Sequence, residues 1–196
     1  QIDCLKKLRI LPKVIPALQA LIERGYTLVM ISNQDGLGTA SFPQGAFQTV
    51  QKKLLDLFSR RGISFGQIFI CPHVERDNCG CRKPNIGLLW DFLQTTHVDK
   101  QQSFVVGDRT SDEEFAKNIG IRFIKAETNG TFPQIEWKNK QYKQIAFVIT
   151  EPKLKSRSVF DASLLLLRKH KRTLELESAF VLCVHIDNRI QKQSSS

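Results

Sequence analysis

Three cysteines and a histidine lie within eleven residues, between Cys71 and Cys81. Cys71 and His73 form one short pair, and Cys79 and Cys81 form a second pair after a five-residue turn. Thiolate sulfur and imidazole nitrogen are the ligands that zinc prefers, in a tetrahedral arrangement at about 2.0–2.3 Å. Because four protein ligands leave no open coordination position, the spacing predicts a structural zinc site rather than a catalytic one.

Arg82, Lys83 and Pro84 follow the cysteine cluster directly. The Lys83 ammonium offers a point charge for a phosphate, and Arg82 could hold a second anionic group of a substrate. The alternative is that the cluster is a set of unrelated reduced residues and that Lys83 is ordinary surface charge. Clustering of zinc-ligand residues next to a basic pair favours the metal site.

A second polar loop begins with Ser32 and Asn33, after the apolar run 26–31. Their hydroxyl, amide and backbone N–H groups are hydrogen-bond donors suited to a phosphate. Taken alone, the pair could equally be a simple turn. Asp35, two residues further on, could equally be a functional residue or an ordinary loop residue.

A third polar loop begins with Asp108, after a buried apolar run and Gly107. A carboxylate oxygen at this position is a plausible magnesium ligand. The alternative is that Asp108 caps the helix that follows. Asp112, one helical turn later, could bind the metal indirectly or orient Lys83. Arg109 is either a substrate-binding residue or a surface residue.

Helical and extended patterns alternate along the chain, which predicts an α/β fold with a doubly wound parallel sheet. In such sheets ligands bind at the carboxyl ends of the strands, where all three polar loops fall. Residues 1–150 are expected to form one domain, with a further edge strand over 144–150, and 151–196 an appendage of unknown fold. Helices are predicted over 12–25, 44–62, 86–96 and 113–119, and strands over 26–31, 67–70, 103–106 and 121–124.

The formal net charge of the chain is +10. The basic residues are scattered rather than gathered in a stripe with aromatic partners, so we expect a solvated surface and a phosphate-attracting site, without a nucleic-acid partner. The chain contains no apolar run long enough to span a membrane and no signal-peptide pattern. Cysteines of this pattern are typical of a reducing compartment. We therefore expect a cytoplasmic protein.

Three motifs, taken together, resemble the histidinol-phosphate phosphatase branch of the haloacid dehalogenase superfamily. They are the segments 29–39, 71–84 and 105–109, in this order. The resemblance covers about residues 1–150 and implies a haloacid dehalogenase-like fold. It also implies Mg²⁺-dependent hydrolysis of L-histidinol phosphate, a small phosphorylated substrate, to L-histidinol and phosphate in histidine biosynthesis.

The resemblance also implies roles for individual residues. Ser32 and Asn33 would bind the transferred phosphoryl group, Lys83 would be the lysine of the third motif, and Asp108 would bind Mg²⁺. Arg82 and Arg109 would contact the substrate. The four Zn²⁺ ligands of the family would be Cys71, His73, Cys79 and Cys81.

The family's first motif, Asp-x-Asp-Gly-Thr on the first strand, does not occur in this sequence. It supplies the nucleophile and the general acid and base. Asp3 precedes a helix and lacks a paired carboxylate. The resemblance therefore implies a sheet whose first strand would lie upstream of Gln1. We expect the flanking strands to lose a ladder partner and the chain itself to hydrolyse no phosphomonoester.

Related proteins can carry an imidazoleglycerol-phosphate dehydratase as a second half. Residues 151–196 contain only His170 and His185, far from each other, and do not resemble that domain. Two other functions stay open. One is a heptose-bisphosphate phosphatase, whose insert between the two ligand pairs is typically longer than residues 74–78. The other is a non-catalytic zinc-containing binding domain.

Overall fold

The computed structural model describes residues 2–128, 131–133 and 179–184. Within them a single five-stranded sheet has the order β2-β1-β5-β3-β4. Its strands are β1 (Thr27–Asn33), β2 (Phe65–Cys71), β3 (Phe104–Gly107), β4 (Arg122–Lys125) and β5 (Ala179–Val184). The α-helices are α1 (Val14–Glu23), α2 (Gln44–Ser59), α3 (Trp90–Thr95) and α4 (Thr110–Ile119). Short 3-10 helices span Leu5–Lys7, Glu75–Asp77 and Gly87–Leu89.

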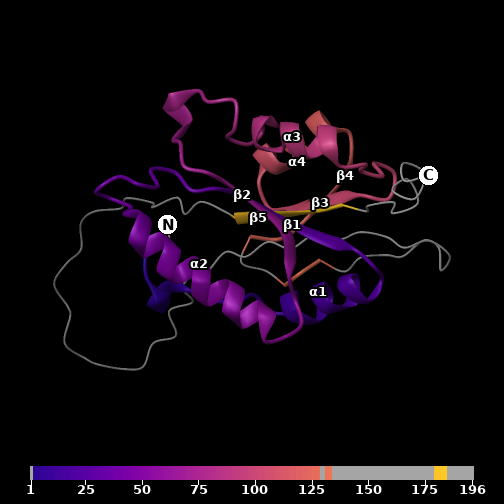
Figure 1. Ribbon diagram of the computed structural model, residues 1–196, viewed down its shortest axis with the longest axis horizontal. Coiled ribbons are helices and arrows are strands. Elements are labelled where there is room, and N and C mark those ends of the chain that lie inside the picture. Colours follow the sequence, from indigo (N-terminus) through magenta and orange to yellow (C-terminus); the bar gives the residue numbers. More distant parts are fainter. Residues whose placement is uncertain (1, 129–130, 134–178, 185–196) are drawn as a thin grey trace, which may run out of the picture.

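The sheet lies between two helical layers. Helices α1 and α2 cover one face, and α3 and α4 cover the other (Figure 1). The α/β class and the four strands and four helices predicted within residues 12–124 are thus confirmed. The edge strand predicted over 144–150 lies outside the described residues.

Two parallel pairs make up most of the sheet. β1 pairs with β2, and β3 pairs with β4. The register of the first pair sets Asn33 beside Cys71. The end of β1 and the start of the cysteine cluster therefore lie next to each other.

β5 was not predicted from the sequence. It lies between β1 and β3 and runs antiparallel to both. The gap expected beside the parallel strands is therefore occupied by a strand from the C-terminal part of the chain. The physical reason is that the backbone N–H and C=O groups of buried strands require partners.

The hydrophobic core explains why the strands read as continuous apolar runs. Residues of β1 from Leu28 to Ile31 are all at most 1% exposed, because helices cover both faces of the sheet. On the face of the sheet that α1 and α2 cover, Leu18 of α1 and Phe58 of α2 are fully buried. Full burial of such a side chain contributes about 1.5–3 kcal/mol to the free energy of unfolding.

Two helix starts differ from the sequence prediction. The helix predicted from residue 86 begins with the 3-10 turn Gly87–Leu89, in which the N–H of Leu89 donates to the Ile86 carbonyl at 2.8 Å, and α3 follows from Trp90. α4 begins at Thr110 rather than at 113. The backbone N–H of Arg109 donates to Oδ2 of Asp112 at 2.8 Å, which caps the first turn.

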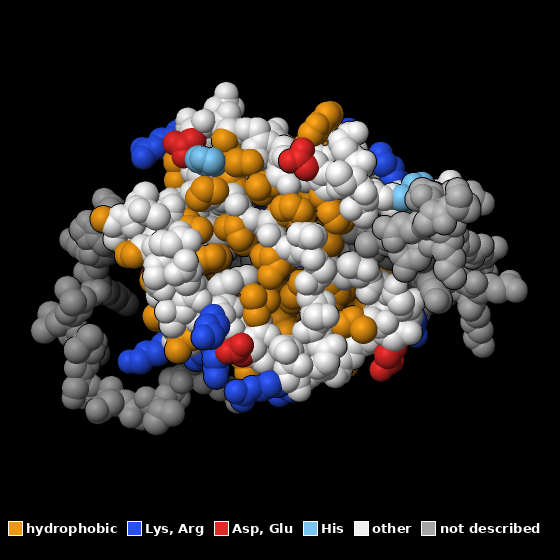
Figure 2. Space-filling model, in the orientation of Figure 1, with side chains coloured by type: hydrophobic (Ala, Val, Ile, Leu, Met, Phe, Trp, Pro, Cys, Tyr) orange, Lys and Arg blue, Asp and Glu red, His pale blue; other side chains and the backbone are white. Residues whose placement is uncertain are grey.

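Charged side chains of both signs lie around the rim of the face shown in Figure 2, and hydrophobic side chains occupy its centre. This face presents no basic stripe of the kind that tracks a nucleic-acid backbone. Among the described residues no helix has the length and apolar character needed to cross a membrane.

Candidate active site and metal centre

Asn33, the last residue of β1, holds the backbone of Lys83. Its amide nitrogen donates to the Lys83 carbonyl at 3.3 Å, and its amide oxygen accepts from the Lys83 N–H at 3.1 Å. Asn33 is 7% exposed, so both bonds are shielded from water. In the structure, the side chain that was predicted to bind a phosphoryl group uses its amide to fix the position of the lysine.

Lys83 is buried, with 3% of its surface exposed. Its Nζ donates to the Ile31 carbonyl at 3.4 Å and lies 3.3 Å from Oδ1 of Asp112. Burial lowers the pKa of Lys83 to about 8 although the Asp112 carboxylate opposes the shift. Burial likewise raises the pKa of Asp112 to about 6 against the effect of Lys83. Asp112 therefore lies where it can orient Lys83, which is one of the two alternatives predicted for it.

Asp108 lies just beyond the end of β3. Its Oδ2 accepts a hydrogen bond from the Thr128 hydroxyl at 2.9 Å. Its Oδ1 is buried and has no hydrogen-bond partner in the described part of the chain. Asp112, not Asp108, caps α4, which removes the capping alternative. A buried carboxylate oxygen without a partner suits Mg²⁺, which binds proteins through one or two carboxylates and otherwise keeps water or phosphate oxygens.

The remaining polar residues at this edge have partners within it. Arg82 forms an ion pair with Asp35 that crosses from the cysteine loop to the loop after β1. The Ser32 hydroxyl accepts from Nε2 of Gln34 at 2.6 Å. Both loops are therefore joined by side chains as well as by the sheet.

The four ligand-type residues of the cysteine loop converge. Their ligand atoms all lie within 4.8 Å of one another. The sulfur of Cys81 is 3.3 Å from each of the other two sulfurs and 3.1 Å from Nδ1 of His73. Tetrahedral zinc–sulfur bonds of about 2.3 Å place sulfurs ~3.8 Å apart, so a small expansion accommodates the ion. The donor set and its geometry fit a closed four-coordinate metal site.

The thiols of the cluster differ in acidity. Burial raises the pKa of Cys71 to about 12 and also raises that of Cys81. Burial acts in the same direction on Cys79, but hydrogen bonds from Cys81 and from backbone N–H groups outweigh it and lower the pKa to about 7. Three adjacent thiolates repel one another, and a bound dication would offset that repulsion.

Backbone and amide hydrogen bonds fasten the cysteine loop to the rest of the site. The Gln34 N–H donates to the Cys71 carbonyl at 2.7 Å, and Nδ2 of Asn118 on α4 donates to the Pro84 carbonyl at 2.9 Å. Nδ2 of Asn85 closes the loop on the Cys79 carbonyl at 2.9 Å. Sequence reasoning missed Asn85 and Asn118, because an amide on a loop or helix surface carries no pattern of its own.

A cavity of about 390 Å³ opens between the cysteine loop and α4. Of the predicted site residues, Asn33, Arg82, Lys83 and Arg109 line it together with Cys79, whereas Ser32 and Asp108 lie outside its lining. Residues that the sequence did not single out complete the wall: Glu75, Asn78, Pro84, Asn85, Ser111 and Glu114. Arg82 and Lys83 of the cysteine loop and Arg109 before α4 thus line one cavity, and the carboxylates of Glu75 and Glu114 line it as well.

Proteins of similar sequence were found in several bacteria. The chain is 47% identical over 135 residues to the "Histidine biosynthesis bifunctional protein HisB" of Legionella pneumophila (strain Lens), and the match covers 69% of this chain and 38% of that protein. It is 50% identical over 125 residues to the protein of the same name from Campylobacter jejuni subsp. doylei, covering 64% and 36%. The chain therefore spans little more than a third of these relatives.

A solved structure has a similar fold. D,D-heptose 1.7-bisphosphate phosphatase from B. bronchiseptica, complexed with magnesium and phosphate, matches with a TM-score of 0.57 and 28% identity. The match covers 63% of this chain and 69% of that one. The family described as polynucleotide kinase 3 phosphatase matches residues 6–129, the stretch that contains all three polar loops. The chain belongs to this phosphatase family, with the haloacid dehalogenase-like fold.

Proposed function

We propose that this chain is a phosphatase domain for Mg²⁺-dependent hydrolysis of L-histidinol phosphate in histidine biosynthesis. The observation that carries the proposal is the buried Lys83 ammonium, held by Asn33 and Asp112 beside the free oxygen of Asp108. A fixed cation in a water-poor site stabilises developing phosphate charge far better than one in solvent. The names of the relatives from Legionella and Campylobacter support the pathway.

Each residue has a role in this proposal. Asp108 would hold Mg²⁺, which neutralises charge on the phosphate when bound. Lys83 binds a phosphate oxygen, and Ser32 and Asn33 add donors at the end of β1. Arg82 and Arg109 orient the rest of the substrate in the cavity.

The cysteine loop has a positioning role. Zn²⁺ bound by Cys71, His73, Cys79 and Cys81 would fix the loop that carries Lys83, two residues after the last ligand. Reduced thiols of this kind favour the cytoplasm as the site of action.

Hydrolysis also requires an oxygen nucleophile. Three aspartates at this edge have other roles in this proposal: Asp35 pairs with Arg82, Asp112 pairs with Lys83, and Asp108 would hold Mg²⁺. None of them lies on a strand between β1 and β3. We therefore propose that the attacking carboxylate comes from outside the described residues.

The test measures binding and turnover separately. ³¹P NMR titration of the full chain with L-histidinol phosphate and Mg²⁺ should shift the phosphate resonance, and Lys83→Met should abolish the shift. A chain extended before Gln1 by an Asp-x-Asp-Gly-Thr strand should release phosphate. If the extended chain is folded, binds Mg²⁺ and still releases no phosphate from L-histidinol phosphate, the substrate assignment is wrong.

A heptose-bisphosphate phosphatase is the second candidate, because the solved structure with the TM-score of 0.57 is that of a D,D-heptose 1.7-bisphosphate phosphatase. The same extended chain, assayed side by side on a heptose bisphosphate and on L-histidinol phosphate, separates the two. If the extended chain binds neither of these two substrates, a non-catalytic zinc-containing binding domain is the better description.

A further inference from the structure

The cavity between the cysteine loop and α4 carries charges of both signs. Three basic side chains, of Arg82, Lys83 and Arg109, and two acidic ones, of Glu75 and Glu114, line it. A phosphate is attracted by the basic side chains and repelled by carboxylates placed beside it. Phosphate binding alone therefore does not account for the two glutamates.

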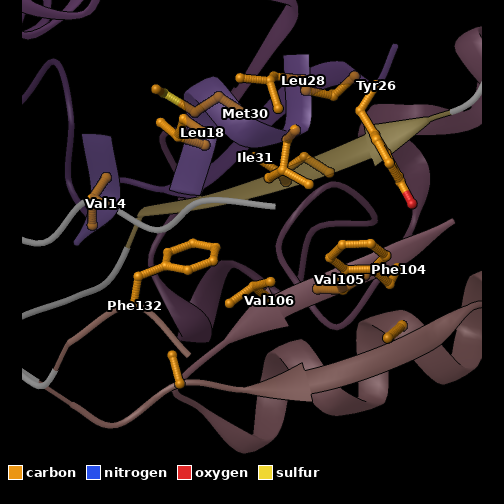
Figure 3. Packing of buried hydrophobic residues seen from close by; sticks show 14 of the residues in the cluster. Val14, Leu18, Tyr26, Leu28, Met30, Ile31, Phe104, Val105, Val106 and Phe132 are labelled. Atoms are coloured by element: carbon orange, nitrogen blue, oxygen red, sulfur yellow. The ribbon is translucent and has the colours of Figure 1, made fainter. Parts of the chain in front are cut away.

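The basic and acidic groups of this cavity lie at different depths. Lys83 is 3% exposed, and its Nζ donates to the Ile31 carbonyl at 3.4 Å. Ile31 belongs to the packed core shown in Figure 3, so this end of the cavity rests on the core of the protein. Glu75 and Glu114 are exposed. The cavity is thus basic at its buried end, where Lys83 lies, and acidic where it opens to solvent.

The two glutamates come from separate elements. Glu114 lies on α4 three residues after Ser111, which also lines the cavity, and residues at this spacing are neighbours on a helix surface. Glu75 is the first residue of the 3-10 helix in the cysteine loop. Neither carboxylate forms an ion pair with another residue that the structure describes. Both are therefore available to a cationic group of a ligand.

A phosphomonoester with an ammonium group on its organic part matches this arrangement of charges. Its phosphate would lie at the buried, basic end of the cavity, and its ammonium group at the acidic opening. L-histidinol phosphate has this form, with a primary amine on the carbon next to the one that bears the phosphate. A bisphosphate would instead bring its second phosphate against two carboxylates, and such a contact between like charges weakens binding. The same two residues would thus favour an amine and disfavour a second phosphate.

We propose that Glu75 and Glu114 are specificity-determining residues, which bind the ammonium group of an amine-bearing phosphomonoester. The inference rests on the proposed function for the phosphate end of the cavity, and it adds the class of organic group that the other end selects. The two carboxylates act on the part of the substrate that does not react. Their effect is therefore expected in the affinity for the substrate.

The first test compares two esters that differ in one charge. Calorimetric titration of the full chain with Mg²⁺, near neutral pH, measures the affinity for L-histidinol phosphate and for its N-acetyl derivative, which lacks the ammonium charge. The unchanged chain should bind the amine about tenfold more tightly, because each exposed ion pair contributes about threefold. The double variant Glu75→Gln, Glu114→Gln should bind the two esters within about twofold of each other.

The control removes two other acidic residues, so the net charge changes equally. Glu113→Gln alters the neighbour of Glu114 on α4, and Glu23→Gln alters the end of α1, on the other face of the sheet. Neither residue lines the cavity. This control variant should keep the tenfold preference for the amine. If it loses the preference, or if the Glu75→Gln, Glu114→Gln variant keeps it, the proposal is wrong.

A heptose bisphosphate gives the opposite sign. Its affinity should rise about tenfold in the Glu75→Gln, Glu114→Gln variant, because the repulsion of the second phosphate is removed. Inorganic phosphate should bind to the variant at least as tightly as to the unchanged chain, which shows that the phosphate end is intact. A structural role of the two glutamates would weaken all three ligands together, and that result overturns the proposal.

Turnover separates this inference from the proposed function. If the two substitutions abolish the preference for the amine, but the chain extended by an Asp-x-Asp-Gly-Thr strand releases no phosphate from L-histidinol phosphate, the specificity assignment stands and the proposed reaction fails. If the extended chain releases phosphate and its KM for L-histidinol phosphate is unchanged by the two substitutions, the reaction stands and the specificity assignment fails. Binding of neither ester to the unchanged chain also overturns the assignment.

Discussion

The ammonium nitrogen of Lys83 lies 3.3 Å from Oδ1 of Asp112, and their side chains are 1% and 0% exposed. This buried ion pair ties the loop after the cysteine cluster to the first turn of α4. A buried pair is costly to break, because removal of one partner leaves an uncompensated charge in the interior.

A double-mutant cycle on this pair tests its contribution. Lys83→Met should lower the free energy of unfolding by about 3–5 kcal/mol, since Asp112 is then buried alone. Adding Asp112→Asn should recover part of that loss, although the cap that Asp112 gives Arg109 is weakened. Urea unfolding measures both. Lys7→Met, which removes the exposed pair with Asp3, should change the stability by less than ~1 kcal/mol. If Lys83→Met and Lys7→Met lower the free energy of unfolding equally, the buried position of the Lys83–Asp112 pair is contradicted.

Metal removal tests the cysteine cluster. The purified chain should contain one zinc ion by elemental analysis, because four ligand atoms already lie within 4.8 Å of one another. Cys81→Ser should lose the ion, and a strong chelator should lower the melting temperature of the unchanged chain. Cys4→Ser is the control, as Cys4 is exposed and outside the cluster. Zinc retained by Cys81→Ser would show that the site is elsewhere.

Gly107 is required by close packing at the start of α4. A Cβ at this position would lie 2.5 Å from Cβ of Asp112 and 2.9 Å from the ring of Phe123. Gly107→Ala should therefore destabilise the chain by about 1–3 kcal/mol and displace Asp112. Gly45→Ala is the matched control, since a Cβ there meets nothing within 4 Å and should be neutral or stabilising by ~0.5–1 kcal/mol. Thermal unfolding of both variants decides.

Asn33 should matter for phosphate binding through Lys83. Asn33→Ala leaves the Lys83 backbone N–H and carbonyl without these partners, at a cost of about 1–3 kcal/mol. We expect weaker binding of inorganic phosphate in a ³¹P titration as well as lower stability. Gln94→Ala, at an exposed position on α3, should change neither. If the Asn33→Ala variant is folded and binds phosphate with unchanged affinity, Asn33 has no role in phosphate binding.

Local sequence patterns predicted most of the fold. Apolar runs located β1, β2, β3 and β4, of which β1 and β3 are buried almost throughout, whereas β2 and β4 at the edges of the sheet are only partly buried. The zinc-type ligands were found because all four lie in one short loop, so their proximity in space follows from their proximity in sequence.

Contacts between residues that are far apart in the sequence could not be predicted from local patterns. Asn33 uses its amide on the backbone of Lys83, fifty residues away, and an isolated asparagine gives no sign of such a partner. β5 is the larger case. Which strand fills a buried edge depends on competition between distant segments, and its apolar sequence specifies neither neighbour nor direction.

The position of β5 in the chain also fixes an order of events during synthesis. β1 to β4 all leave the ribosome before β5, which begins about 70 residues after the end of β3. At a synthesis rate of about 5–20 residues per second, β5 is complete roughly 4–15 s after β3, so the facing edges of β1 and β3 stay without β5 for that time. Slower translation lengthens the interval in which the edges of β1 and β3 lack the strand that pairs with both of them.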